Sequence, residues 1–201
     1  LSNVDLSQNT VLYSLHAEFN AGLDLDISKN TVLGLLYCND NGMSTLDISN
    51  NLALTTLNFN NNKISTLDFS KNTALKSIYA VNNLFEAVDV SKNTALTYIS
   101  FNTNKLTSLD VTGLDALKSI FATSNNLTEI IGANNAAKIG TVNITGNKLN
   151  LATLPQPEAL KTTFNYAPQQ AYVIAESIKE GQALDLSSQN NVKGILTAPA
   201  Q

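Results

Sequence analysis

The sequence predicts a mainly β, right-handed solenoid with coils of 21 residues, in which short strands form one parallel sheet on the concave side. Two periodic features carry this prediction. An aspartate followed two residues later by serine or threonine recurs six times from Asp5 to Asp110. Leucine recurs with the same period, at Leu12, Leu33, Leu54, Leu75, Leu96 and Leu117. The composition, 43% hydrophobic and 14% charged over 201 residues, is typical of a folded chain.

The unit is clearest in the third copy, which has the spacing L-x-x-L-x-L-x-x-N-x-L. Its pattern residues are Leu54, Leu57, Phe59, Asn62 and Ile64. This is the leucine-rich-repeat pattern, and the chain resembles leucine-rich-repeat proteins over nearly all of residues 4–166. The resemblance implies about seven to eight repeats in residues 1–166. It also implies that ligands bind on the concave face.

Each part of the repeat has a physical reason. The alternation at Leu57 and Phe59 predicts a short strand with one buried face, stacked at about 4.8 Å on the strands of neighbouring coils. The asparagine after each strand is expected to be buried and to satisfy backbone groups of the turns along the stack. It recurs at Asn20, Asn41, Asn62, Asn83, Asn104 and Asn125.

About ten residues remain to close each coil after the strand, fewer than a helix and two turns require. The convex side is therefore predicted to be extended or 3-10 in conformation. Later copies depart from the pattern: Gly113 and Leu114 interrupt the sixth, and the seventh gains one residue before Val142. An eighth, weaker copy would point Phe164 and Tyr166 inward.

The composition changes after Pro155, because all four prolines lie between there and the end of the chain. Strand-like pieces at 172–174 and 183–186 predict that residues 167–201 form a β-rich cap or begin a following β module. Together with the aspartate-serine repeat, the segment NYAPQQAYVIAESIKEGQALDLSSQ resembles secreted or surface leucine-rich-repeat proteins of gut Bacteroidetes. That resemblance implies an extracytoplasmic location, with membrane anchoring through residues missing from the N-terminus as one arrangement.

Several function classes are disfavoured. The net charge of −4 and the twelve lysines without any arginine argue against a nucleic-acid partner. No apolar run approaches the roughly 20 residues of a transmembrane segment. His16 is the only histidine, Cys38 is expected to point inward, and no motif for a cofactor or a catalytic constellation is present. We therefore expect neither an enzyme nor a bound cofactor.

The six aspartates from Asp5 to Asp110 would repel one another when stacked, so each carboxylate needs compensation. Calcium bound by aspartate, serine and asparagine oxygens is one solution. The favoured alternative is that each aspartate accepts hydrogen bonds from its own turn, as Asp-x-Ser segments commonly do.

The concave face carries the candidate binding residues. Its central outward row is predicted to contain His16, Tyr37, Asn58, Tyr79, Ser100, Phe121 and Asn143. Tyr37, Tyr79 and Phe121, with Tyr98 diagonally beside them, are the expected anchors, and His16, Asn58 and Asn102 are the expected polar contacts. Exposed rings among amides suit a protein or a glycan ligand. Two alternatives stay open: the rings pack only on one another, or the domain is a spacer or stalk without a ligand.

Overall fold

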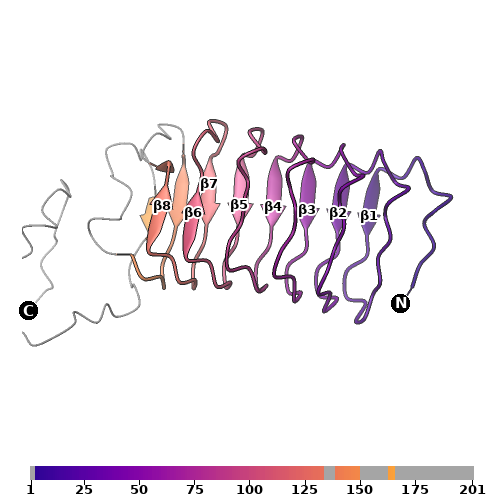
Figure 1. Cartoon of the computed structure of the whole chain (residues 1–201), viewed down its shortest axis with the longest axis horizontal. Coiled ribbons are helices and arrows are strands. Elements are labelled where there is room, and N and C mark those ends of the chain that lie inside the picture. The colour runs from indigo at the N-terminus through magenta and orange to yellow at the C-terminus, as the bar shows by residue number, and fades with distance from the viewer. Residues whose placement is uncertain (1–2, 134–138, 150–162, 166–201) are drawn as a thin grey trace, which may run out of the picture.

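The computed structural model describes residues 3–133, 139–149 and 163–165. Its main feature is an eight-stranded parallel sheet whose strands are stacked along the long axis of the molecule (Figure 1). In sheet order the strands are β1 (Ser14–His16), β2 (Leu35–Tyr37), β3 (Thr56–Asn58), β4 (Ser77–Tyr79), β5 (Tyr98–Ser100), β7 (Ser119–Phe121), β9 (Thr141–Asn143) and β10 (Thr163–Asn165). The predicted parallel-sheet solenoid is confirmed.

Equivalent residues of successive repeats lie side by side. Leu36 on β2 is paired with Leu57 on β3, 21 positions later. Ile120 is paired with Val142, so the extra residue of the seventh copy is absorbed before β9 without shifting the sheet. β10 continues the stack in register with β9, which supplies the predicted eighth strand. The side chains of Phe164 and Tyr166 and the predicted cap at 167–201 lie outside the described residues.

The opposite side of the coil is extended, as its length predicts. Two further strands, β6 (Ser108–Asp110) and β8 (Glu129–Ile131), pair in parallel to form a separate two-stranded sheet. No α-helix occurs in the described ranges. Within those ranges the chain also has no helix that is long and apolar enough to span a bilayer.

The core fills the space between the two sides of the coil. The central residue of each strand from β2 to β7 along the main sheet is fully buried, including Leu57 and Ile78. Beneath the sheet, Phe59 packs on Phe69 at 6.4 Å and on Phe85 at 5.9 Å between ring centroids. These apolar contacts connect each coil to the next and hold the main sheet in place.

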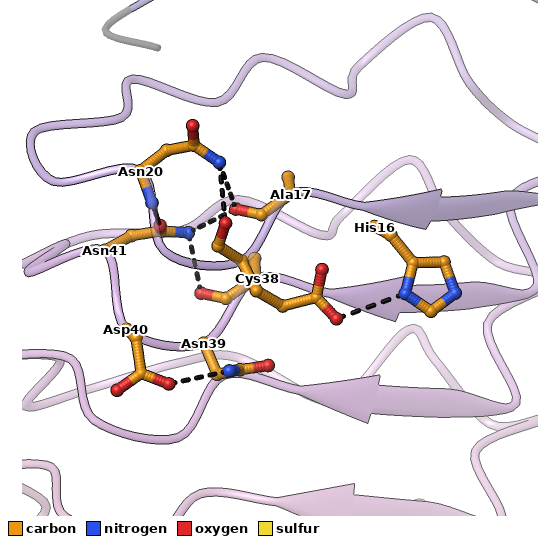
Figure 2. A network of polar contacts seen from close by, with 8 residues as sticks. His16, Ala17, Asn20, Cys38, Asn39, Asp40 and Asn41 are labelled. Atoms are coloured by element: carbon orange, nitrogen blue, oxygen red, sulfur yellow. Dashed lines mark hydrogen bonds and ion pairs between the residues drawn. The ribbon is translucent and has the colours of Figure 1, made fainter.

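A ladder of buried asparagines links the turns that follow the strands, as predicted. Asn41 donates from its side-chain amide to the carbonyl groups of Ala17 and Cys38, at 2.8 and 3.0 Å. Its Oδ1 accepts from the N–H of Asn20 in the preceding repeat (Figure 2). Each such asparagine thereby satisfies backbone groups that the turn would otherwise leave unpaired in the core.

A second buried asparagine ladder, which the sequence analysis did not identify, lies after the aspartate-serine turns. Asn72 donates from its amide to the carbonyl groups of Ile48 and Asn51, at 3.0 and 2.9 Å. The Oδ1 atom of each member accepts no hydrogen bond from the described residues. The ladder ends where Leu114 takes the place of the asparagine in the sixth copy. Its members are Asn30, Asn51, Asn72 and Asn93.

Candidate functional site on the main sheet

The outer face of the main sheet is built by the two residues that flank each buried strand centre. In β2, β3 and β4 the middle residue is buried and both neighbours are partly exposed. Because side chains alternate across a strand, the flanking residues of all the strands point to one face. Tyr37, Asn58 and Tyr79 are consecutive members of its central row, paired strand to strand.

A stacked pair of rings occupies the first two strands. The imidazole of His16 lies over the ring of Tyr37, with centroids 4.4 Å apart and planes within 9° of parallel. The Nδ1 atom of His16 is 3.1 Å from Oε1 of Glu18, which fixes the orientation of the exposed imidazole (Figure 2). The rings therefore stand upright on the sheet, with one face of Tyr37 turned toward His16 and the other toward the next strand, β3.

A group of three rings occupies β4, β5 and β7. The ring of Tyr98 is 4.7 Å from that of Tyr79 and 5.4 Å from that of Phe121, with tilts of 31° and 35°. Both distances lie within the range that aromatic pairs prefer. Burial, together with nearby Tyr79, raises the pKa of the Tyr98 hydroxyl. Tyr98 is thus a bridge between two rings that are two repeats apart in the central row.

Ser100 occupies its predicted position in the central outward row, but it is buried there. Ser100 is only 3% exposed, although its strand position is equivalent to the half-exposed Tyr79. Its side chain lies between Tyr79 and Phe121 in the row, where the ring of Tyr98 crosses over it. The direction in which a long side chain leans is not fixed by strand register, so the repeat pattern did not reveal this burial.

The side chains of the two predicted asparagine contacts, Asn58 and Asn102, differ in the hydrogen bonds that they make within the protein. Oδ1 of Asn102 accepts from the N–H of Thr123 at 2.8 Å, so this amide joins two neighbouring repeats. Within the part of the chain that the structure describes, Oδ1 of Asn58 accepts only from the N–H of Asn60 in its own repeat, at 3.2 Å. Asn58 is half-exposed and separates the ring pair from the group of three rings.

Phe19 and Tyr13 carry exposed rings that were not identified from the sequence, and Phe19 is the more exposed of the two. Phe19 is 77% exposed and adopts a φ of +60°, a left-handed conformation that is strained for a bulky residue. The later repeats place small or polar residues there, at Asp40, Asn61, Asn82, Thr103 and Ser124. The signal was present in the sequence as the one aromatic residue at this repeat position, but the backbone conformation was needed to interpret it.

The aspartate turns follow the favoured prediction. Asp68 accepts from the N–H of Ser70 at 2.8 Å, and the five equivalent aspartates accept in the same way from the residue two positions later. Hydrogen bonds from the Ser70 side chain and backbone lower the pKa of Asp68. Among the described residues no group of three or more histidine, cysteine or acidic side chains is arranged to hold a metal ion.

The inward position predicted for Cys38 is confirmed. The side chain is fully buried in the second repeat. Burial first, and the charge of Glu18 second, raise the pKa of the thiol to about 12. The thiol therefore stays protonated at neutral pH and is a poor nucleophile.

Several solved protein structures are similar to this parallel-sheet solenoid. The functional domain of InlJ from Listeria monocytogenes, which includes a cysteine ladder, matches 96% of the chain with a TM-score of 0.71 and 25% identity. A leucine-rich-repeat protein of Leptospira interrogans matches 84% of it with a TM-score of 0.72 and 19% identity. The chain has a leucine-rich-repeat fold. The complex of LRIM1 with APL1C also matches this leucine-rich-repeat chain, over 82% of its length, with a TM-score of 0.69 and 18% identity.

The leucine-rich-repeat chain spans 46%, 47% and 36% of the InlJ, Leptospira and LRIM1/APL1C chains, respectively. No protein-family model and no curated protein sequence matches it. The InlJ domain includes a cysteine ladder. The present chain has a single cysteine, Cys38, and cannot form such a ladder. In this chain asparagines link the turns of successive repeats.

Proposed function

We propose that this leucine-rich-repeat domain is a non-enzymatic binding module that holds a protein or glycan on the outer face of its main sheet. The observation that carries the proposal is the row of partly exposed rings on that face: Tyr37, Tyr79, Tyr98 and Phe121. These rings lie outside the core, which has its own phenylalanines. Aromatic side chains on a rigid, mostly uncharged surface are the residues that dominate binding energy at interfaces.

The scaffold suits this role. Each ring stands on a strand whose neighbours in the sheet are fixed by backbone pairing and by the asparagine ladder, so ordering the face on binding costs little conformational entropy. His16, held by Glu18, and the amide of Asn58 add polar groups between and beside the rings. Such groups would orient a ligand that the rings hold.

Two further observations support parts of the proposal. A chain with the same fold occurs in the complex of LRIM1 with APL1C, which supports a protein partner by structural analogy. The resemblance of the C-terminal segment to secreted or surface leucine-rich-repeat proteins supports an extracytoplasmic location, where such a module would meet proteins and glycans.

The test is a binding screen of the purified chain against glycan, mucin and extracellular-matrix arrays. It is run beside the variant Tyr37→Ala/Tyr79→Ala/Phe121→Ala and beside a control, Lys71→Ala/Lys92→Ala, which alters exposed residues near the aspartate turns. We expect a ligand that is retained by the control and lost by the ring variant, provided that all three proteins melt at similar temperatures. A ligand retained by the ring variant would place the site elsewhere.

The spacer function is the second candidate, and one observation favours it. Tyr98 already contacts both Tyr79 and Phe121, so the group of three rings is partly satisfied within the protein itself. A stiff stalk would need nothing more from these residues than sheet stability. Absence of binding by the unaltered chain across all the arrays would favour this function.

A further inference from the structure

The rings on the main sheet form one column with one interruption. From β1 to β7 the column runs His16, Tyr37, then Asn58 without a ring, then Tyr79, Tyr98 and Phe121. We call the interruption the Asn58 gap. Tyr37 and Tyr79 flank it from strands two places apart in the sheet, which separates them by about 10 Å.

Both flanking rings turn a face toward the gap. Tyr37 is within 9° of parallel to His16 on the strand before it, so its second face is directed at Asn58. Tyr79 packs on Tyr98 from the following strand, which leaves the opposite face of Tyr79 directed at Asn58. The floor of the gap is the half-exposed Asn58 amide, whose Nδ2 donates no hydrogen bond within the described residues.

The protein itself shows what a gap of this width holds. Tyr79 and Phe121 are likewise two strands apart, and between them the row carries the small Ser100. There the ring of Tyr98 fills the space, at 4.7 and 5.4 Å from its two neighbours. One tyrosine ring therefore fits between two rings at this spacing. In the Asn58 gap the residue equivalent to Tyr98 is Thr56, which is too short to do the same.

We propose that the Asn58 gap receives one aromatic side chain, tyrosine or phenylalanine, from a protein partner, so that the inserted ring completes the column between Tyr37 and Tyr79. The inference rests on the proposed binding function and selects its ligand class. No charged residue lies at the positions that surround the gap on β2, β3 and β4, which suits an uncharged ring. The Nδ2 of Asn58 would donate to a tyrosine hydroxyl.

The matched variant is Thr56→Tyr/Asn58→Ser, which copies the Tyr98 and Ser100 arrangement of β5 into β3 and fills the gap from within. Its counterpart, Tyr98→Thr/Ser100→Asn, empties the filled position and creates a second gap. Both changes are on the outer face and leave the buried strand centres, Leu57 and Ile99, unchanged. Thermal melting verifies that each variant is folded.

The probe is N-acetyl-tyrosinamide, titrated against each protein and followed by NMR of its ring protons, with methyl β-glucopyranoside and N-acetylprolinamide as comparison probes. We expect saturable, upfield-shifting binding of the tyrosine probe to the unaltered chain at millimolar concentration. We expect affinity at least about tenfold weaker in Thr56→Tyr/Asn58→Ser, and a second equivalent of probe bound by Tyr98→Thr/Ser100→Asn.

Equal binding of the tyrosine probe to the unaltered chain and to the filled variant would overturn the inference, as would no binding of that probe at all. Preferential binding of the glucoside would overturn it in favour of a sugar ligand. The array screen of the proposed function distinguishes failure of ring insertion from failure of the binding function. A partner lost by Tyr37→Ala/Tyr79→Ala/Phe121→Ala but bound normally by Thr56→Tyr/Asn58→Ser would support the binding function while rejecting ring insertion.

Discussion

The side-chain amide of Asn62 donates to the carbonyl of Cys38, 24 positions earlier in the chain, at a distance of 3.0 Å. The same amide donates to Phe59 in its own repeat at 2.9 Å, while its Oδ1 accepts from the N–H of Met43 at 2.9 Å. One side chain thus satisfies backbone groups on both sides of a repeat boundary. The boundary lies in the turns that follow the strands carrying the candidate binding rings.

Substitution Asn62→Ala should lower the free energy of unfolding by about 2–4 kcal/mol, because it removes the Oδ1 atom that accepts from the buried N–H groups of Asn41 and Met43. The measurement is urea denaturation. Asn39→Ala is the control, because Asn39 is partly exposed and, among the described residues, its amide donates only to the neighbouring Asp40. This substitution should change the free energy of unfolding by no more than about 0.5 kcal/mol. Equal effects of the two substitutions would contradict a structural role for the ladder.

Substitution Phe19→Asn should stabilise the protein by about 1 kcal/mol. Asparagine tolerates the left-handed conformation that Phe19 adopts, and the 77% exposed ring loses little burial on removal. The reverse change at the equivalent position, Asn61→Phe, should destabilise. Thermal denaturation of both variants tests the pair, and a drop in melting temperature for Phe19→Asn would show that its ring makes a contact worth more than the strain.

The thiol of Cys38 should be inert in the folded protein, because burial raises its pKa to about 12 and blocks access. Dithionitrobenzoate should label it only in denaturant, at a rate set by unfolding. Fast labelling of the native protein at pH 8 would mean that the second repeat opens readily, whereas the ladder bonds of Asn41 predict that it stays closed.

The aspartate turns should make stability fall in acid. Hydrogen bonds from the following serine or threonine lower the pKa of these carboxylates below the ordinary value of 3.8. A carboxylate with a lowered pKa in the folded state stabilises the fold fully above its unfolded pKa, and the contribution is lost as pH falls through the lower, folded pKa. As the pH is lowered from 6 to 2, the melting temperature should therefore drop less for Asp47→Asn/Asp68→Asn/Asp89→Asn than for the unaltered chain. Parallel curves of melting temperature against pH would show that these carboxylates are not the origin of the acid sensitivity.

The parts of the fold set by periodicity could be predicted from the sequence. Strand positions, the buried Leu57 and the ladder of Asn62 follow from a repeat in which equivalent residues must stack. The ladder of Asn72 recurs with the same period, but it lies outside the leucine motif and was therefore overlooked. The burial of Ser100 and the strain at Phe19 depend on a side-chain direction and a backbone angle, which residue spacing does not encode.

The bonds of both asparagine ladders span a fixed number of residues. Asn72, for example, bonds to Asn51, 21 positions earlier, and to Ile48, 24 positions earlier. The first span is one whole repeat, and the second is one repeat plus a three-residue turn. A deletion or duplication of one complete repeat would rebuild the same bonds at the new junction. The bonds also tolerate the single extra residue before Asn147, whereas a change of half a repeat would bring residues that are not equivalent side by side. Recombination between copies can therefore lengthen or shorten the molecule in whole steps. Removal of the repeat that carries Asn58 would bring Tyr37 directly beside Tyr79, so a single genetic event could erase one binding position while leaving the scaffold intact.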